Sequence, residues 1–342
     1  MKQVWIPRRG GPEVLEVRDA PEPACGDGEL LVDVAAAGIN FADIMARMGL
    51  YPDAPPLPCV VGYEVAGTVR AVGRGIDDIR PGQRVVGLTR FGGYASVVAG
   101  PLEHFVPLPD TINFETAAAI PVNYLTAWLM LHRQAAVREG DHVLVHSAAG
   151  GVGQAAMQIC KRAGAKVVAS ASEGKHARLF DAGAIACINS RDNDVVARVR
   201  EATAGRGVDV VLDPIGGASF QRSYACLAPM GRLCMFGASS FAPGTRRSIA
   251  AVLAGVLKMR RFSPVSLMND NRGVFGLNLG HLWEEAAVIR AIFQEIVDLV
   301  HDGTFAPVVD RAYAFDEAGE AHAYIQSRAS FGKVVLRPTL PS

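Results

Sequence analysis

A glycine-rich segment, Ala148-Ala149-Gly150-Gly151-Val152-Gly153, has the clearest chemical signature in the sequence. It lies between a strand predicted over residues 141–147 and a helix predicted over residues 154–165. Small residues let the backbone turn tightly and approach a pyrophosphate, and the helix N-terminus supplies oriented N–H groups. Because the turn opens an alternating strand–helix region, we interpret it as a dinucleotide site rather than a plain structural turn.

The end of the next predicted strand bears on which dinucleotide binds. The strand ends at Ser172 and is followed by Glu173 and Lys175. An NAD site usually has an acidic residue here to hold the ribose hydroxyls, whereas hydroxyls and a lysine suit the 2′-phosphate of NADPH. We therefore expect NADPH, with NADH as the alternative because Glu173 is able to reach a ribose.

Three polar side chains in the first third of the chain are candidates to contact a substrate: Asn40, Tyr51 and Tyr63. Amide and phenol groups can donate hydrogen bonds to an oxygen on which charge develops. Asn40 has an alternative interpretation as a turn residue or helix cap, and each tyrosine as a packed aromatic. Asp43 and Arg47 have the spacing of an ion pair that steadies this loop.

The elements around these residues predict an α/β protein with two domains. Strands and helices alternate from about residue 123, which is typical of a doubly wound parallel sheet. The first third and the tail contain short β-prone runs separated by glycine and proline. We expect a β-rich domain of residues 1–122 and 268–342, interrupted by a dinucleotide-binding domain of residues 123–267.

Composition supports this organisation. The chain has 342 residues, whereas single cores stop growing at ~250–300 residues. The formal net charge is +0, so no long-range field favours nucleic acid or an anionic membrane. The six cysteines are scattered, as in reduced proteins, and no run approaches the ~20 apolar residues of a membrane span. We expect a cytoplasmic protein without nucleic-acid or membrane partners.

Several motifs in order resemble the medium-chain dehydrogenase/reductase superfamily. They are Gly38–Asp43, Pro58–Gly67, Gly92–Ala95 and the glycine-rich turn, and within the superfamily they resemble the zinc-free quinone oxidoreductase branch. Asn123–Trp128 and Gly276–Leu282 resemble the vesicle amine transport protein subgroup more specifically. The resemblance implies a GroES-like catalytic domain plus a Rossmann domain.

The same resemblance bears on metal binding. Zinc-dependent relatives have a cysteine and a histidine in the neighbourhoods where this chain has Asn40 and Tyr63. The chain also lacks their clustered four-cysteine lobe, and no set of three ligands with an open position is evident. We expect no metal, and the resemblance favours a functional role for Asn40.

The resemblance also implies a set of cofactor-binding residues beyond Gly150 and Gly153. These are Thr126, Gly151, Val152, Ser172, Lys175, Ile215, Phe236, Gly237, Ser239, Phe275, Leu277 and Arg328.

The implied reaction is hydride transfer from NADPH to an electron-poor carbon skeleton. Without a Lewis acid, a simple alcohol or carbonyl is a less favourable substrate. The favoured hydride acceptor is an activated C=C bond, in an enone or an enoyl thioester such as an enoyl-CoA, or a quinone. Two alternatives are a non-catalytic cofactor-binding or trafficking protein and a zinc-free alcohol dehydrogenase. Relatives are often dimers, so we expect a homodimer.

A basic cluster follows the last strand of the expected dinucleotide domain. It comprises Arg246, Arg247, Lys258, Arg260 and Arg261. These cations suit the phosphates of a coenzyme A or carrier-protein thioester, although a solvated basic face is the simpler interpretation.

Overall fold

The computed structural model describes residues 1–192, 194–245 and 247–338, which form two compact units. The first unit comprises residues 1–125, 244–247 and 279–342, and the second comprises 126–243 and 248–278. These bounds differ from the expected domains mainly near residue 268. The difference arises because residues 273–276 form a strand that pairs within the parallel sheet of the second unit.

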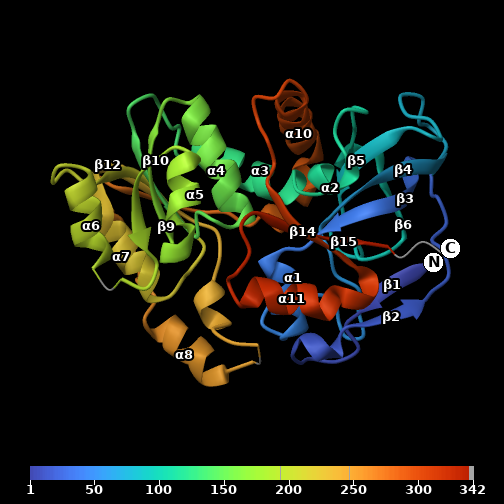
Figure 1. The fold of residues 1–342 in the computed structure, drawn as a ribbon, viewed down its shortest axis with the longest axis horizontal. Helices are drawn as coiled ribbons and strands as arrows, with labels where there is room; N and C mark the ends of the chain where they lie inside the picture. The colour runs from blue at the N-terminus through green and yellow to red at the C-terminus, as the bar shows by residue number, and fades with distance from the viewer. Residues whose placement is uncertain (193, 246, 339–342) are drawn as a thin grey trace. The chain divides into compact units, whose positions relative to one another are not determined.

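The second unit is built on a parallel sheet with the strand order β10-β9-β8-β11-β12-β13. Figure 1 labels β9, β10 and β12 of this sheet. Its strands are β8 (His142–His146), β9 (Lys166–Ala171), β10 (Ala184–Asn189), β11 (Val208–Asp213), β12 (Leu227–Met235) and β13 (Gly273–Gly276). The chain moves outward from β8 to β10 and then returns to β11 beside β8. Because such crossovers are right-handed, the helices that connect β8 to β10 and those that connect β10 to β12 cover opposite faces of the sheet. The position between β8 and β11, where the strand order reverses, is the topological switch point.

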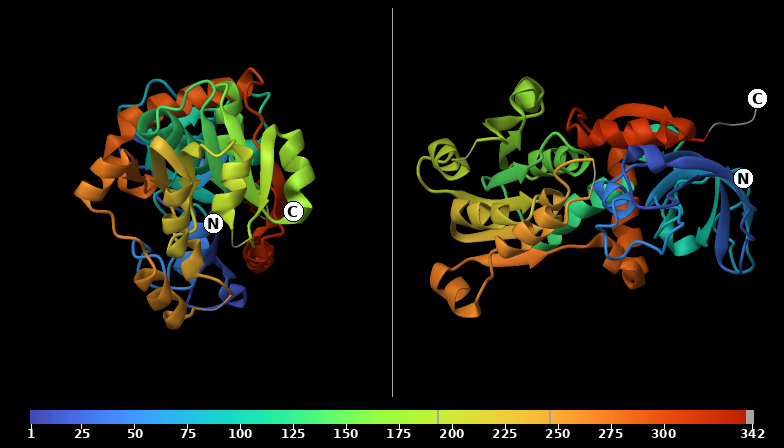
Figure 2. Two further views of the ribbon diagram at one scale, coloured as in Figure 1. Left: turned by 90° about the vertical axis from the view of Figure 1, so that its left-hand side faces the viewer. Right: turned by 90° about the horizontal axis from the view of Figure 1, so that it is seen from below.

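The helices of the second unit connect these strands, as the views of Figure 2 also show. They are α4 (Gly151–Arg162), α5 (His176–Asp181), α6 (Val195–Ala202), α7 (Ala218–Cys226), α8 (Ile249–Leu257) and α9 (Pro264–Asp270). The alternation predicted from the sequence is thus observed from β8 to β12. Helix α4 begins at Gly151, three residues before the predicted start, because the glycines themselves form its first turn.

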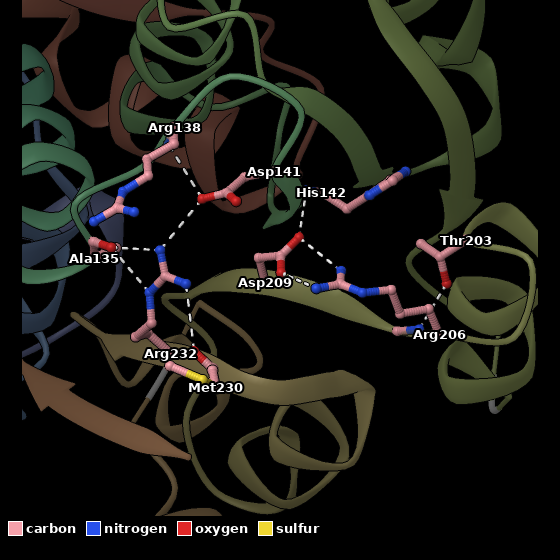
Figure 3. Close-up of polar contacts among 10 residues, drawn as sticks. Ala135, Arg138, Asp141, His142, Thr203, Arg206, Asp209, Met230 and Arg232 are labelled. Carbon is pink, nitrogen blue, oxygen red and sulfur yellow. Dashed lines mark hydrogen bonds and ion pairs between the residues drawn. The ribbon is translucent and has the colours of Figure 1, made fainter. Parts of the chain in front are cut away.

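The amino ends of three parallel strands are held by charged side chains of the second unit (Figure 3). Asp209 of β11 accepts from the backbone N–H of His142 at 2.9 Å and pairs with Arg206 at 2.7 Å. Arg232 of β12 donates to the carbonyl of Ala135 and lies 3.3 Å from Asp141. The polar groups named here, at the amino ends of the strands, are therefore paired within the second unit.

The first unit contains a seven-stranded, largely antiparallel sheet in the order β14-β15-β3-β4-β5-β7, with β6 also paired to β3. The strands are β3 (Glu29–Gly38), β4 (Glu64–Val72), β5 (Arg84–Leu88), β6 (Val97–Pro101), β7 (Phe105–Pro107), β14 (Val309–Ala314) and β15 (Lys333–Arg337). A separate pair is formed by β1 (Lys2–Trp5) and β2 (Glu16–Asp19). The C-terminal strand β15 pairs with β3, so both ends of the sequence build one sheet.

The helices of the first unit include elements that the sequence pattern did not predict. The helices of this unit are α1 (Phe41–Arg47), α2 (Phe114–Ala117), α3 (Pro121–Trp128), α10 (Ala286–His301) and α11 (Ala318–Gln326), with the last three residues of α3 in the second unit. Of these, α11 agrees with a helix expected in the tail over residues 317–327. The 16-residue α10 was not predicted, although its apolar residues recur on one buried face. Within the described residues, no helix is both long enough and apolar enough to cross a membrane.

Candidate functional site

The carboxyl ends of the parallel strands gather most of the residues predicted to bind a cofactor. They follow five strands: the glycine-rich turn after β8, Ser172 after β9, Ile215 after β11, Phe236 after β12 and Leu277 after β13. In open α/β sheets, ligands bind outside the carboxyl ends of the strands at the topological switch point. The arrangement in the second unit therefore matches the location expected for a dinucleotide.

The glycine-rich turn has the local geometry that a pyrophosphate requires. Gly150 is the N-cap of α4 in an extended conformation, and no side chain caps the helix. Because the first N–H groups of a helix lack intrahelical partners, those of Gly151 and Val152 are available to an anion. A Cβ on Gly153 would lie 2.5 Å from the carbonyl oxygen of Ser147, so only glycine permits this close packing. The residues present fit a dinucleotide phosphate.

Asp213 organises the neighbouring strand end. It is fully buried at the end of β11 and accepts from the backbone N–H of Ile215 at 2.7 Å. The hydroxyls of Ser219 and Ser223 donate to its other oxygen at 2.7 and 2.6 Å. His146 Nε2 lies 3.0 Å from the Ser223 hydroxyl, and burial lowers the pKa of His146. Sequence reasoning missed this cluster, which fixes the turn carrying Ile215.

Ser172 and Lys175 lie together after β9, where the adenosine ribose of a dinucleotide would be expected. Ser172 is the N-cap of a single 3₁₀ turn, and its carbonyl accepts from the backbone N–H of Lys175 at 3.0 Å. Both residues are half-buried, whereas Glu173 is exposed. This placement keeps a hydroxyl and an ammonium group at one corner of the predicted site.

The remaining predicted residues of the second unit cluster near β12 and β13. Gly237 is packed so closely that a Cβ would lie 2.6 Å from the carbonyl oxygen of Pro214. The backbone N–H of Ser239 donates to that same carbonyl at 3.1 Å. Leu277 donates to the carbonyl of Met235 just beyond β13, whereas Phe275 lies within the strand and is partly exposed. The ends of β11 and β12 are therefore fixed to each other.

Asn40 lies in a polar cluster of the first unit. Its side-chain Nδ2 donates to Glu64 Oε1 at 2.8 Å, and its Oδ1 accepts from Lys333 Nζ at 2.7 Å. Lys333 also forms an ion pair with Glu64, and both side chains are buried. Sequence reasoning assigned no role to Glu64 or Lys333, although each is a charged residue at the start of a strand. Asn40 is the N-cap of α1, yet its amide is held by these two residues.

The two candidate tyrosines are neighbours. The rings of Tyr51 and Tyr63 meet edge to face with centroids 6.3 Å apart, and Tyr63 also contacts Phe91. The Tyr63 hydroxyl is buried, and Tyr51 is its polar neighbour. Burial, together with the nearby Asp43, raises the pKa of Tyr63 well above its usual range. Tyr63 is therefore a protonated donor at neutral pH.

Asp43 and Arg47 do not form the ion pair that their spacing suggested. Asp43 accepts from the backbone N–H groups of Asn40 and Gly62, at 2.7 and 3.0 Å, and from the Tyr94 hydroxyl at 3.1 Å. Burial raises the pKa of Asp43 to about 7. Arg47 instead donates to the carbonyl of Gly10 and to the side chain of Gln326. The two side chains leave α1 in different directions and stabilise different contacts.

Two further residues were predicted to bind the cofactor, and a basic cluster was predicted as well. Thr126 is buried on α3 at the start of the second unit. Arg328 is exposed in the first unit after α11, with a positive φ of 60°. In the basic cluster, Arg246 lies outside the described residues, and the Arg260 guanidinium stacks 4.2 Å from the Tyr224 ring centroid. Within the described part of the chain, no group of three or more His, Cys, Asp or Glu residues is arranged to hold a metal ion.

Two family models match parts of the chain. Residues 26–110 match the alcohol dehydrogenase GroES-like domain, and residues 182–336 match a family described as zinc-binding dehydrogenase. The synaptic vesicle membrane protein VAT-1 homolog of Mus musculus is 37% identical over 325 residues, covering 95% of this chain and 80% of that protein.

Two solved structures are also similar. Escherichia coli quinone oxidoreductase complexed with NADPH has a TM-score of 0.86 and 32% identity, covering 99% of this chain and 100% of that chain. The CurK enoyl reductase has a TM-score of 0.85 and 28% identity, covering 98% and 99%. The two units thus have the GroES-like and Rossmann folds, and the chain belongs to the medium-chain dehydrogenase/reductase superfamily.

Proposed function

We propose that this chain is an NADPH-dependent oxidoreductase that reduces an activated C=C bond, in an enone or enoyl thioester, or a quinone, without zinc. The observation that carries the proposal is the uncapped first turn of α4 at the switch point of the parallel sheet. The similarity to a quinone oxidoreductase complexed with NADPH and to an enoyl reductase supports the same reaction class.

The second unit would hold the cofactor. The N–H groups of Gly151 and Val152 would bind the pyrophosphate, and Ser172 with Lys175 would bind the 2′-phosphate. The turn fixed by Asp213 would present Ile215 to the nicotinamide end. When bound, NADPH supplies a hydride.

The first unit would stabilise charge on the acceptor. Tyr63 carries a protonated hydroxyl beside Tyr51, and such a group is suited to donate to a carbonyl or quinone oxygen. Asn40 carries a second amide proton beyond the one directed at Glu64. Hydride addition to the β-carbon of an enone leaves an enolate oxygen, which these donors would stabilise until a proton is added at the α-carbon.

Independence from zinc is supported by the side chains around Glu64. The ammonium group of Lys333 already contacts this carboxylate and Asn40, and a cation in that position opposes the binding of a second cation.

The direct test is oxidation of NADPH, beside NADH, with a quinone, a simple enone and a short enoyl-CoA, followed by product analysis. Saturable turnover with one acceptor is expected. Lys175→Ala is expected to raise the Kd for NADPH by roughly tenfold, the loss of one charge-assisted contact, with little change for NADH. Lys161→Ala on the exposed end of α4 is the matched control. NADPH binding without turnover of any acceptor would contradict the proposal.

A second candidate function is non-catalytic cofactor binding in trafficking, and one observation favours it beyond the VAT-1 similarity. Helix α8 buries none of its residues and exposes Leu253 and Leu257, at 58% and 84%. Exposed apolar patches often mark interaction sites. Co-sedimentation with liposomes that is lost in Leu253→Glu/Leu257→Glu, together with absent turnover, would select this function.

We also propose a cytoplasmic homodimer. β13 is the last strand at one edge of the parallel sheet, and within the described residues its outer edge has no strand partner. Light scattering on the purified protein tests the dimer.

A further inference from the structure

The polar cluster around Asn40 is assembled by three neighbouring strands. Lys333 opens β15 and Glu64 opens β4, and these two strands lie on either side of β3. β3 ends at Gly38, two residues before Asn40. The cluster therefore connects β15, β4 and the loop after β3 that carries Asn40.

Gly38 provides the space in which the ion pair forms. A Cβ on Gly38 would lie 2.5 Å from Glu64 Oε1 and 2.6 Å from the carbonyl oxygen of Ala118. The φ angle of Gly38 is not positive, so the requirement is for space rather than for backbone freedom. The missing side chain lets the Glu64 carboxylate extend across β3 toward Lys333.

The ion pair determines which way the Asn40 amide faces. An ammonium group only donates hydrogen bonds, and an ionised carboxylate only accepts them. Oδ1 must therefore face Lys333 and Nδ2 must face Glu64, as the distances of 2.7 and 2.8 Å record. Rotating the amide by half a turn would place NH₂ against the ammonium and oxygen against the carboxylate, so both contacts would become repulsive.

Glu64 has a second contact that fixes its own position. Its Oε2 accepts from the backbone N–H of Val122 at 2.8 Å, in the first turn of α3. Both carboxylate oxygens are thus occupied, and the side chain is fully buried. Asn40 itself is only half-buried, which leaves its second amide proton accessible.

We propose that Lys333 and Glu64 are positioning residues that lock the Asn40 carboxamide in one orientation, with its remaining N–H directed at the acceptor oxygen. This inference rests on the proposed reductase function. Neither residue contacts the acceptor; each acts through Asn40. Replacing Lys333 and Glu64 would therefore leave the Asn40 amide in place but change the direction of its N–H group.

The test is a double-mutant cycle. Breaking a buried ion pair on one side leaves an uncompensated charge and endangers folding, so the informative variant is Glu64→Gln/Lys333→Met, which removes both charges at similar volume. We expect kcat/KM for the acceptor to fall by about 10- to 100-fold, through kcat more than KM, because a misaligned donor fails chiefly in the transition state. The Kd for NADPH is expected to be unchanged.

The cycle separates positioning from a general structural role. In an Asn40→Ala background, adding Glu64→Gln/Lys333→Met is expected to cause little further loss, since both act through the same amide. Arg337→Met, on the exposed end of the same strand β15, is the matched control and is expected to retain full activity. Fully additive losses would overturn the proposal.

A readout without turnover distinguishes this inference from the proposed function. The side-chain amide protons of Asn40 can be assigned by NMR from their loss in Asn40→Asp. In the wild type, the proton directed at Glu64 is expected to exchange slowly with water, and in Glu64→Gln/Lys333→Met it is expected to exchange faster. Unchanged exchange and chemical shifts would overturn the positioning role even if the enzyme is active. A locked amide in a chain without any turnover would instead contradict the reductase function alone.

Discussion

Two carboxylates of the first unit, Glu64 and Asp43, are both fully buried and both hold Asn40, but they are stabilised differently. Glu64 binds the Asn40 side chain and has the cation Lys333 in contact. Asp43 binds the Asn40 backbone N–H and is otherwise surrounded by neutral donors, including Tyr94. Asn40 is thus held by two carboxylates, and Glu64, unlike Asp43, is in contact with a cation.

The difference teaches what each carboxylate contributes. A buried charge is tolerated only when it is paired and hydrogen-bonded, and Glu64 meets both conditions. Asp43 accepts its hydrogen bonds from neutral groups, and the charge of Lys333 acts on it at longer range. Its pKa of about 7 places its change of charge near physiological pH. The position of the Asn40 side chain therefore rests on a buried ion pair, and the start of α1 on a carboxylate whose pKa lies near 7.

The largest expected effect comes from breaking the charged pair on one side. Lys333→Met leaves Glu64 buried without its cation and is expected to lower the free energy of unfolding by about 3–5 kcal/mol. Chemical denaturation measures the change. Glu64→Gln/Lys333→Met is expected to recover most of the loss, and a double variant no more stable than Lys333→Met would contradict this account.

A smaller effect, visible as a pH dependence, is expected from Asp43. Its pKa is 3.8 in the unfolded chain and about 7 when folded, so the folded state binds its proton more tightly. The Asp43 contribution to stability is therefore full below pH 4, falls as pH rises toward 7 and then levels, a change on the order of a few kcal/mol. Asp43→Asn is expected to lose this slope, whatever its absolute stability. Parallel wild-type and Asp43→Asn profiles between pH 4 and 7 would show that Asp43 is ionised throughout.

The smallest effect is expected from Tyr94→Phe. This change removes one neutral donor to Asp43 and the contact of the hydroxyl with His322 Nε2 at 3.2 Å. We expect the free energy of unfolding to fall by about 1–2 kcal/mol, a small loss because two backbone donors to Asp43 remain. The pKa of Asp43 is expected to rise further, because its ionised form loses one hydrogen bond. The wild-type and Tyr94→Phe pH–stability curves measure both. A cost as large as that of Lys333→Met would remove the distinction between the two carboxylates.

The fold was largely predictable from the sequence because its signals are local. Strand–helix alternation, the glycine-rich turn and glycine or proline between strands each act within about ten residues. Of the helices that the sequence pattern missed, α10 begins after Glu285 and not after a glycine-rich turn. The unit boundary near residue 268 depended on the pairing of β13 with β12, a non-local contact that periodicity does not encode.

The candidate site was predictable in its backbone part and not in its buried polar part. The turn at Gly150 and the residues after strand ends follow from local spacing. The role of Lys333 does not, because its partner Glu64 lies on another strand far away in sequence. Asp213 illustrates the same limit: an acidic residue ending an apolar strand was visible, but its two serine partners depend on how α7 packs. Cofactor preference and the roles of individual site residues stay predictions.

The participation of β15 in the sheet has a consequence for the order of assembly. Glu64 and Lys333 are 269 residues apart in sequence, and the whole second unit is synthesised between them. Such distant pairings form late, because the chain must lose loop entropy before they stabilise it. A nascent chain lacking β15 would leave Ala37 and Gly38 of β3 without their β15 partners and Glu64 without its cation. The ion pair therefore makes completion of the first unit depend on β15, so chains that end before β15 are expected to be unstable.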